Sequence, residues 1–264
     1  MSDRRVELEP AYILHHRPFR DSSQIVDVFS REHGKLSLVA RGSRAGKSKL
    51  KGILRPFQRL RLSWALRTEL GTLTGGELAG EPLPLSGDVL FSAYYLNELL
   101  LHFLHRFDPQ PEIFTLYEDV LRRLSASRDP AAALRHFELA LLRLLGYALD
   151  LEHDAASGEP LEDAVPYEYR VEQGAVRGHA GSGGILLNGS LLKSIAAEAF
   201  DDPETLKAAG RLLRRVIGYH LGGKELKSRK VLIELYRDRM RRPAAASGQA
   251  AATRPEDGTA RDDS

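Results

Sequence analysis

The hydrophobic pattern of this chain changes its period near Pro84, and no single type of secondary structure accommodates both parts. Before that proline, apolar and polar residues alternate, most cleanly over residues 36–40 and 60–64, which is typical of half-buried β-strands. After it, apolar residues recur three and four positions apart, as in residues 134–145, which is typical of amphipathic helices. The sequence therefore predicts an α+β chain with strands first and helices second.

Turn residues divide the first part into short strands. Glu32-His33-Gly34 separates two of them, and a long basic loop covers residues 41–56. Five short strands in so small a segment predict a closed or nearly closed barrel. The predicted strands are residues 6–8 leading into 11–14, then 24–29, 35–40, 57–64 and 69–73.

Cap residues support the helices that are predicted for the second part. Ser86 is placed to cap the first helix, Pro130 stands at the start of the third, and Gly146 is placed to end it. The first helix is apolar nearly all round and is expected at the centre of a helical core. The predicted helices are residues 89–106, 112–125, 130 to about 146, 189–199, 203–220 and 228–241.

Two segments depart from the helical pattern. The acidic, turn-rich residues 150–187 predict a small hairpin excursion, with its turn at Gln173-Gly174. The tail from residue 243 consists mainly of Ala, Ser, Gly, Pro and charged residues, a composition that predicts disorder.

The residue types exclude several kinds of chemistry. Without cysteine the chain has no disulfide, thiolate nucleophile, cysteine-ligated zinc or iron–sulfur cluster. The run Gly42–Ser48 is one residue short of a phosphate-binding loop, and the adjacent His15 and His16 are expected on opposite faces of a strand. No recognisable catalytic motif is present, so we expect no catalytic residue, metal or cofactor. Without a signal peptide or long apolar run, we expect a cytoplasmic protein that contacts no membrane.

The net charge of +2 hides an uneven distribution. Residues 1–80 carry +7, residues 81–200 carry −9, and residues 201–264 carry +4. An asymmetry of this size concerns the partners of a protein more than its fold. The basic ends are suited to a polyanion.

The strongest local signal is a run without acidic residues between His33 and Thr68. A solvated surface usually mixes both signs of charge, whereas a nucleic-acid site gains from counterion release by clustered cations. Phe57 and Trp64 in this run could stack on bases, although a small barrel needs them for its core. The predicted DNA contacts here are Lys35, Arg41, Arg44, Lys47, Lys49, Lys51, Arg55 and Arg59.

A second basic cluster follows two glycines that end a helix, Gly222 and Gly223. We expect exposed backbone N–H groups at the start of the next helix to add to its affinity for anions. The predicted DNA contacts here are Lys224, Lys227, Arg229 and Lys230.

Taken in order, several short segments make the chain similar to the RecO family of bacterial recombination mediators. Each is weak alone, and their order and spacing carry the resemblance as far as about Arg242. They are residues 11–23 (AYILHHRPFRDSS), 27–34 (DVFSREHG), 38–42 (LVARG), 52–57 (GILRPF), 85–87 (LSG), 95–100 (YLNELL), 134–142 (LRHFELALL), 145–147 (LGY) and 219–229 (YHLGGKELKSR).

The resemblance implies an N-terminal OB-fold followed by a helical domain. It gives an OB-fold over residues 1–80, a helical domain over 81–242 and a disordered tail over 243–264. Many members of the family hold zinc with four cysteines inside the helical domain. Since this chain has no cysteine, residues 151–187 are expected to be a metal-free counterpart of that region.

The resemblance also implies a function without bond chemistry. RecO proteins bind single- and double-stranded DNA, anneal complementary strands, and act with RecR to load RecA onto DNA coated by the single-stranded-DNA-binding protein (SSB). That role places the chain in the cytoplasm, at the nucleoid. The alternatives are a docking scaffold with incidental DNA affinity, and a nuclease or nucleotide-dependent enzyme.

RecO proteins also bind the acidic, apolar C-terminal tail of SSB in the helical domain. Such a tail needs a cation for its terminal carboxylate. Arg135 matches the family position, with Arg122, Arg123 and Arg143 as alternatives, and the opposing interpretation is that arginines exposed on helices are common.

Overall fold

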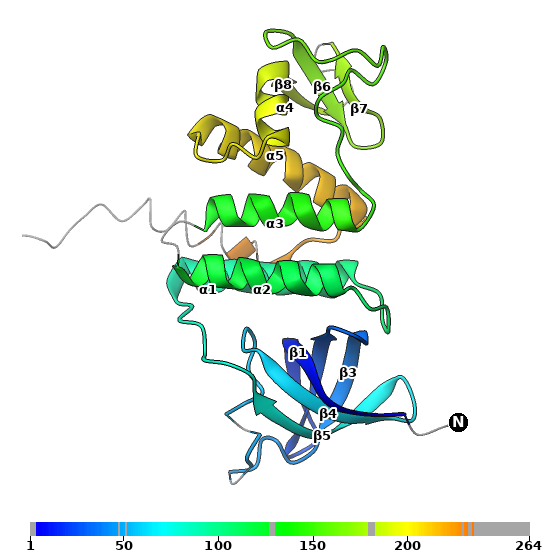
Figure 1. Cartoon of the computed structure of the whole chain (residues 1–264), viewed down its shortest axis with the longest axis vertical. Helices are drawn as coiled ribbons and strands as arrows, with labels where there is room; N and C mark the ends of the chain where they lie inside the picture. The colour runs from blue at the N-terminus through cyan, green and yellow to red at the C-terminus, as the bar shows by residue number, and fades with distance from the viewer. Residues whose placement is uncertain are drawn as a thin grey trace, which may run out of the picture.

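The protein is described by a computed structural model that covers residues 4–46, 48–50, 52–126, 130–178, 183–228, 230, 231 and 234. It is elongated, with a β-barrel at one end, a small sheet at the other, and helices stacked between them (Figure 1). No helix in these ranges has the length and apolar character needed to cross a membrane. The predicted helix 228–241 lies largely outside the described residues, and the tail 243–264 lies wholly outside them.

The barrel is closed by five strands, in the order β1-β2-β3-β5-β4. All neighbouring strands pair antiparallel except β3 and β5, which are parallel. This is an OB-like barrel, so the predicted barrel and the predicted α+β fold are confirmed. The strands are β1 (Arg4–Phe19), β2 (Ser23–Ser30), β3 (Gly34–Ala40), β4 (Leu60–Leu66) and β5 (Leu70–Leu78).

The interior of the barrel is filled by its own apolar side chains. Strict alternation along β3 turns Leu36, Leu38 and Ala40 inward, and Trp64 is fully buried among them. Phe57 has a φ of +67°, a left-handed backbone that interrupts an extended strand, so β4 begins at Leu60 and not at residue 57 as predicted. Phe57 is buried as well, which leaves neither aromatic ring exposed for stacking on a base.

Among the described residues, five of the six predicted helices lie close to their predicted positions. Asp202 caps the last of them by accepting a hydrogen bond from the backbone N–H of Thr205 at 2.8 Å. Gly146 has a φ of +82° just beyond the third, as expected for a residue that ends a helix. Ser86 stands at the predicted cap position but makes no side-chain capping bond. The helices are α1 (Gly87–Phe103), α2 (Pro111–Ala126), α3 (Ala131–Leu144), α4 (Gly189–Ala196) and α5 (Pro203–His220).

The predicted hairpin at residues 150–187 is part of a three-stranded sheet. β6 (Pro166–Arg170) pairs with β7 (Gly174–Arg177) as predicted and also with β8 (Ile185–Asn188), which the hairpin prediction omitted. The sheet packs on the helical core through the buried rings of Tyr167 and Tyr169. In the described ranges, no cluster of three or more acidic or histidine side chains is arranged to hold a metal ion.

One hydrophobic core joins the barrel to the helices. Tyr12 and Phe29 of the barrel pack on Phe114 of α2, with ring centroids 5.4 Å apart in each pair. The ring of Tyr12 also lies 5.1 Å from that of Tyr117. Because this core crosses residue 80, the division into two domains at that point remains a prediction.

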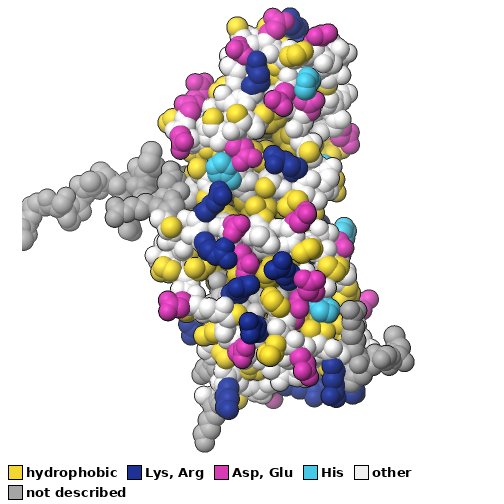
Figure 2. Space-filling view, viewed as in Figure 1, with side chains coloured by type: hydrophobic (Ala, Val, Ile, Leu, Met, Phe, Trp, Pro, Cys, Tyr) yellow, Lys and Arg dark blue, Asp and Glu magenta, His cyan; other side chains and the backbone are white. Residues whose placement is uncertain are grey.

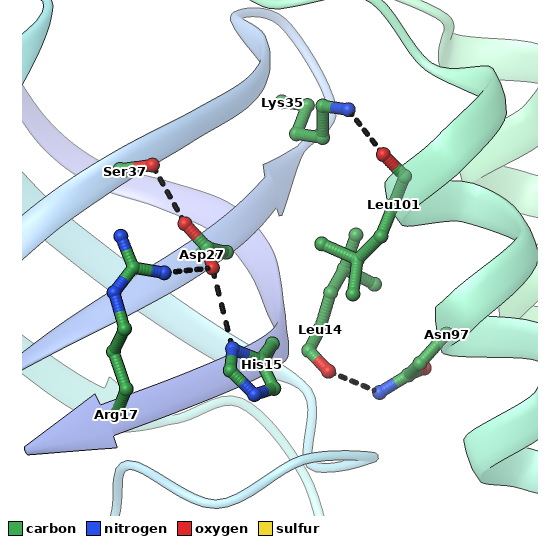
Figure 3. Close-up of polar contacts among 8 residues, drawn as sticks. All are labelled: Leu14, His15, Arg17, Asp27, Lys35, Ser37, Asn97 and Leu101. Atoms are coloured by element: carbon green, nitrogen blue, oxygen red, sulfur yellow. Dashed lines mark hydrogen bonds and ion pairs between the residues drawn. The ribbon is translucent and has the colours of Figure 1, made fainter. Parts of the chain in front are cut away.

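Buried polar contacts fix the same junction (Figure 3). The side-chain amide of Asn97 on α1 donates to the carbonyl oxygen of Leu14 at 2.8 Å and accepts from the Tyr117 hydroxyl at 2.5 Å. The Lys35 ammonium donates to the carbonyl oxygen of Leu101 at 2.6 Å. The barrel therefore has a defined orientation on α1 and α2.

Candidate nucleic-acid interface

The basic loop between β3 and β4 presents exposed cations on an anchored backbone. The N–H of Arg44 donates to the carbonyl oxygen of Ser22 at 2.9 Å, and the buried Ser43 hydroxyl donates to that of Ala40 at 2.9 Å. Four predicted contacts have exposed side chains and make no ion pair with a described residue, namely Arg41, Arg44, Lys49 and Arg55. Lys47 and Lys51 lie outside the described residues.

Two other predicted contacts are used at the junction with the helices. Lys35 gives its ammonium to the carbonyl of Leu101, and burial lowers the pKa of that ammonium. Arg59 pairs with the buried carboxylate of Glu118 on α2 at 2.7 Å, and the Tyr12 hydroxyl donates to the same oxygen. Both cations hold the barrel to the helices, and a role for them in DNA contact remains a prediction.

A groove on the barrel adds an arginine that sequence reasoning missed. This arginine groove, about 540 Å³ in volume, is lined by Arg5, Arg41 and Arg67 together with Thr72 and Thr74. Arg5 stands in a stretch with several acidic residues, so its local charge gave no signal. Only the closure of the barrel brings β1 beside β4, which in turn pairs with β5.

The second basic cluster is exposed, but its helix start is already occupied. Lys224, Lys227 and Lys230 have exposed side chains, and Arg229 lies outside the described residues. The carboxylate of Glu98 on α1 accepts the backbone N–H groups of Lys227 at 2.9 Å and of Ser228 at 2.8 Å. The expectation that these N–H groups are open to an anionic ligand is wrong, because they already donate to the carboxylate of Glu98.

Removing the Glu98 carboxylate is expected to loosen this segment. In Glu98→Ala the amides of Lys227 and Ser228 lose their acceptor, a loss comparable to that of a helix cap, about 1 kcal/mol. Hydrogen exchange followed by mass spectrometry should show faster exchange at these two amides and little change at Asp202, the cap of α5. Unchanged exchange at residues 227 and 228 would show that Glu98 does not hold the segment.

The two basic segments meet at a larger groove between the barrel and α1. This junction groove, about 930 Å³ in volume, is bordered by Pro56 from the basic loop and by Lys224 and Lys227 from the C-terminal cluster. Both His15 and His16 border this groove. Beyond a register shift after Ile13, His15 pairs with Asp27 and His16 with Val26, so the two still alternate between faces of the strand, as expected. Lys and Arg side chains lie mainly over the helices and the barrel in Figure 2, among scattered acidic ones.

Comparison with known proteins decides the family. A family model described as "Recombination protein O N terminal" matches residues 4–81, and one described as "Recombination protein O C terminal" matches residues 85–230. The chain belongs to the RecO family. This membership confirms the resemblance seen in the sequence and supports a role in DNA repair and recombination.

Relatives from three bacteria cover most of this RecO-family chain, and each is named DNA repair protein RecO. The protein of Photobacterium profundum is 42% identical over 226 residues, which span 86% of this chain and 95% of the relative. That of Dechloromonas aromatica is 44% identical over 237 residues, 88% and 97% of the two chains. That of an Azoarcus species is 43% identical over 235 residues, also 88% and 97%.

Three of the four arginines considered for binding an SSB tail in this RecO-family chain each form an ion pair within the chain. Arg122 pairs with Asp119 at 2.6 Å and Arg143 with Glu198 at 3.5 Å, and both are well exposed. Arg135 is only 17% exposed and pairs with the buried Glu138 at 2.9 Å. Each of these arginines is therefore paired with a different carboxylate.

The Arg135 pair lies beside a second pocket. The Tyr95 hydroxyl donates to the same oxygen of Glu138 at 2.6 Å, and burial raises the pKa of the Glu138 carboxyl. Tyr95 also lines an α5 pocket of about 430 Å³, with Arg214, Lys224 and Lys230 as its cations. Sequence reasoning placed Arg214 in a basic cluster without linking it to Arg135, because the link needs the packing of α3 on α5.

Proposed function

We propose that this RecO-family chain binds single- and double-stranded DNA and anneals complementary strands. The observation that carries the proposal is that two basic segments, far apart in sequence, both border the junction groove. Arg55, which directly precedes Pro56 in the first segment, and Lys224 and Lys227 in the second are all exposed. Two DNA strands repel each other through their phosphates, and cations held on a rigid body reduce that repulsion.

The proposed activity requires no bond chemistry from the protein. Base pairing between the strands chooses the sequence, while the basic segments contact phosphates and position each strand. The chain acts with RecR to load RecA onto DNA coated by SSB, at the nucleoid in the cytoplasm. Membership of the RecO family supports this part of the proposal.

The SSB tail is proposed to bind at the α5 pocket. An acidic, apolar peptide needs an apolar floor and a cation for its terminal carboxylate. The pocket offers Ile217, Leu221 and Leu226 as floor, with Arg214 and Lys230 at its border. Arg135 contributes indirectly by neutralising Glu138, and Arg122 and Arg143 remain alternatives on other parts of the surface.

Charge reversal in the basic loop tests DNA binding. The triple substitution Arg44→Glu, Lys49→Glu and Arg55→Glu should weaken binding to any sequence, because phosphate contacts carry no sequence information. The slope of log K against log salt should fall by about 2–3, since each lost phosphate contact contributes about 0.7–0.9. Fluorescence anisotropy over a salt titration measures both quantities.

A matched control separates the loop from net charge. Arg123, Lys207 and Arg211 are exposed on α2 and α5, and their reversal changes the net charge by the same amount. We expect this control to keep most of the affinity and the salt slope. Equal losses in the two triple variants would remove the loop from the site.

A further inference from the structure

The junction groove is lined by aromatic and histidine side chains, and the phosphate contacts proposed above give these rings no role. Two aromatic residues of α1, Phe91 and Tyr94, face it three positions apart, which places them on one side of the helix. We infer that this groove takes unstacked bases of a single DNA strand running between the basic loop and the C-terminal cluster. The inference rests on the proposed function and assigns this groove to the single-stranded ligand.

Tyr94 has the exposure and the support needed for stacking. Its side chain is 42% exposed at the groove, and its ring packs edge-on against the buried Phe57, with centroids 4.9 Å apart. A ring held in this way loses little conformational freedom when a base stacks on it. Leu101 and Val231 complete an apolar floor.

Two polar side chains of α1 in the groove are already engaged. Asn97 uses its amide nitrogen on Leu14 and its oxygen on Tyr117. Glu98 uses its carboxylate on the backbone of Lys227 and Ser228. Neither of these two side chains is left to read the edge of a base. Stacking on Phe91 and Tyr94 is tolerant of sequence, as an annealing protein requires.

The cations that border the junction groove favour an anionic ligand. Lys224 and Lys227 line the groove, and so does Pro56, which directly follows the exposed Arg55. Glu225 also lines the groove, and the Glu98 carboxylate accepts hydrogen bonds from the backbone of Lys227 and Ser228. An anionic strand can thus place phosphates near these cations while its bases enter the apolar centre.

The aromatic lining favours a DNA strand over an acidic peptide as the occupant. Bases stack on aromatic faces whatever their sequence, and residues of both basic segments border the groove. The α5 pocket, with its smaller volume and its arginine, is the better place for a peptide carboxylate. A duplex keeps its bases paired and stacked, so the groove should discriminate single from double strands.

Substitution of Tyr94 tests this inference. Tyr94→Ala should weaken binding of an oligothymidine by about 5-fold to 100-fold, the range for loss of one stacked base, and leave duplex affinity within about 2-fold. Tyr94→Phe should retain binding, because the ring and not the hydroxyl stacks. Tyr147→Ala, which removes a tyrosine exposed elsewhere on the helical part, should leave both affinities unchanged.

Photo-crosslinking gives a readout that does not depend on a substitution. An oligonucleotide carrying 5-iododeoxyuridine should crosslink to Phe91 or Tyr94 within the tryptic peptide 68–106. Fragmentation of that peptide in the mass spectrometer distinguishes these sites from the barrel strand β5, which it also contains. Crosslinks confined to barrel peptides would overturn the inference. So would equal losses of single- and double-strand affinity in Tyr94→Ala, or no loss in a variant that keeps the wild-type melting temperature.

The remaining outcomes distinguish a failure of the proposed function from a failure of the groove assignment. If the wild-type chain binds no DNA, the proposed function itself fails. If it binds DNA and Tyr94→Ala binds an oligothymidine as well as wild type, only the groove assignment fails. If Tyr94→Ala no longer binds an acidic, apolar peptide but binds an oligothymidine as well as wild type does, the groove belongs to a protein partner. That result would overturn the inference.

Discussion

Replacing Phe114 by alanine is expected to lower the free energy of unfolding of the whole chain by about 3–5 kcal/mol. Phe114 is fully buried on α2, and its ring packs on Tyr12 and Phe29 of the barrel. The substitution leaves a cavity in the core that joins the two parts. Because that core is continuous, the barrel and the helices should lose stability together.

Two probes in one urea titration measure this effect. Fluorescence of Trp64, the single tryptophan, reports on the barrel, and far-ultraviolet circular dichroism reports mainly on the helices. Both transitions should shift to lower urea by the same amount. The control Leu186→Ala removes an exposed side chain from β8 and should shift neither by much. A helical transition that moves while the Trp64 transition stays in place would show that the two parts unfold independently.

Replacing Arg135 by alanine is expected to destabilise the chain by about 3–5 kcal/mol near neutral pH. Arg135 is the described ion-pair partner of Glu138, a buried carboxylate. Removing one member of a buried pair leaves the other charge uncompensated in a medium that solvates it poorly. The effect should appear as a loss of stability before any effect on a partner protein.

The pH dependence gives this prediction a sign. Burial raises the pKa of Glu138 and the charge of Arg135 lowers it, so Arg135→Ala should raise that pKa further. A carboxyl whose pKa is raised in the folded state loses stability as pH rises from its unfolded value to its folded value. The destabilisation by Arg135→Ala should therefore be smaller at pH 5 than at pH 8, as measured by urea unfolding at each pH.

Two further variants check the cause. Adding Glu138→Gln to Arg135→Ala should recover part of the stability and remove most of the pH dependence. Arg122→Ala breaks an exposed pair with Asp119 and should cost less than about 1 kcal/mol. An effect of Arg135→Ala that is equally small and independent of pH would mean that its guanidinium is free to serve a ligand.

Much of the fold could be predicted because it depends on local patterns. Alternation over β3 predicted the side that is buried, and Gly146 marks the end of a helix through its own backbone preference. The strand β8 was missed because it is four residues long and acquires its partner only when β6 is in place. Phe57 was assigned to a strand because its apolar character fits, while its left-handed backbone depends on the packing around it.

The site was harder to predict because its deciding contacts are distant in sequence. Composition identified the basic loop, but nothing near Lys35 or Arg59 indicates that Leu101 and Glu118 use their charges. The carboxylate of Glu98 reaches a helix start at Ser228 from another part of the chain. Charge patterns predict which segments are basic, and tertiary packing decides which of those cations remain available.

The rate of annealing of complementary DNA strands tests the central proposal most directly. Wild-type protein and the variant Lys224→Glu, Lys227→Glu and Lys230→Glu are compared over a salt titration, with and without SSB. We expect the wild type to accelerate annealing at low salt, to lose that effect as salt rises, and to exceed the variant under both conditions. No acceleration by the wild type, or equal acceleration by the two proteins at every salt concentration, would contradict the proposal that the chain anneals strands held at these two basic segments.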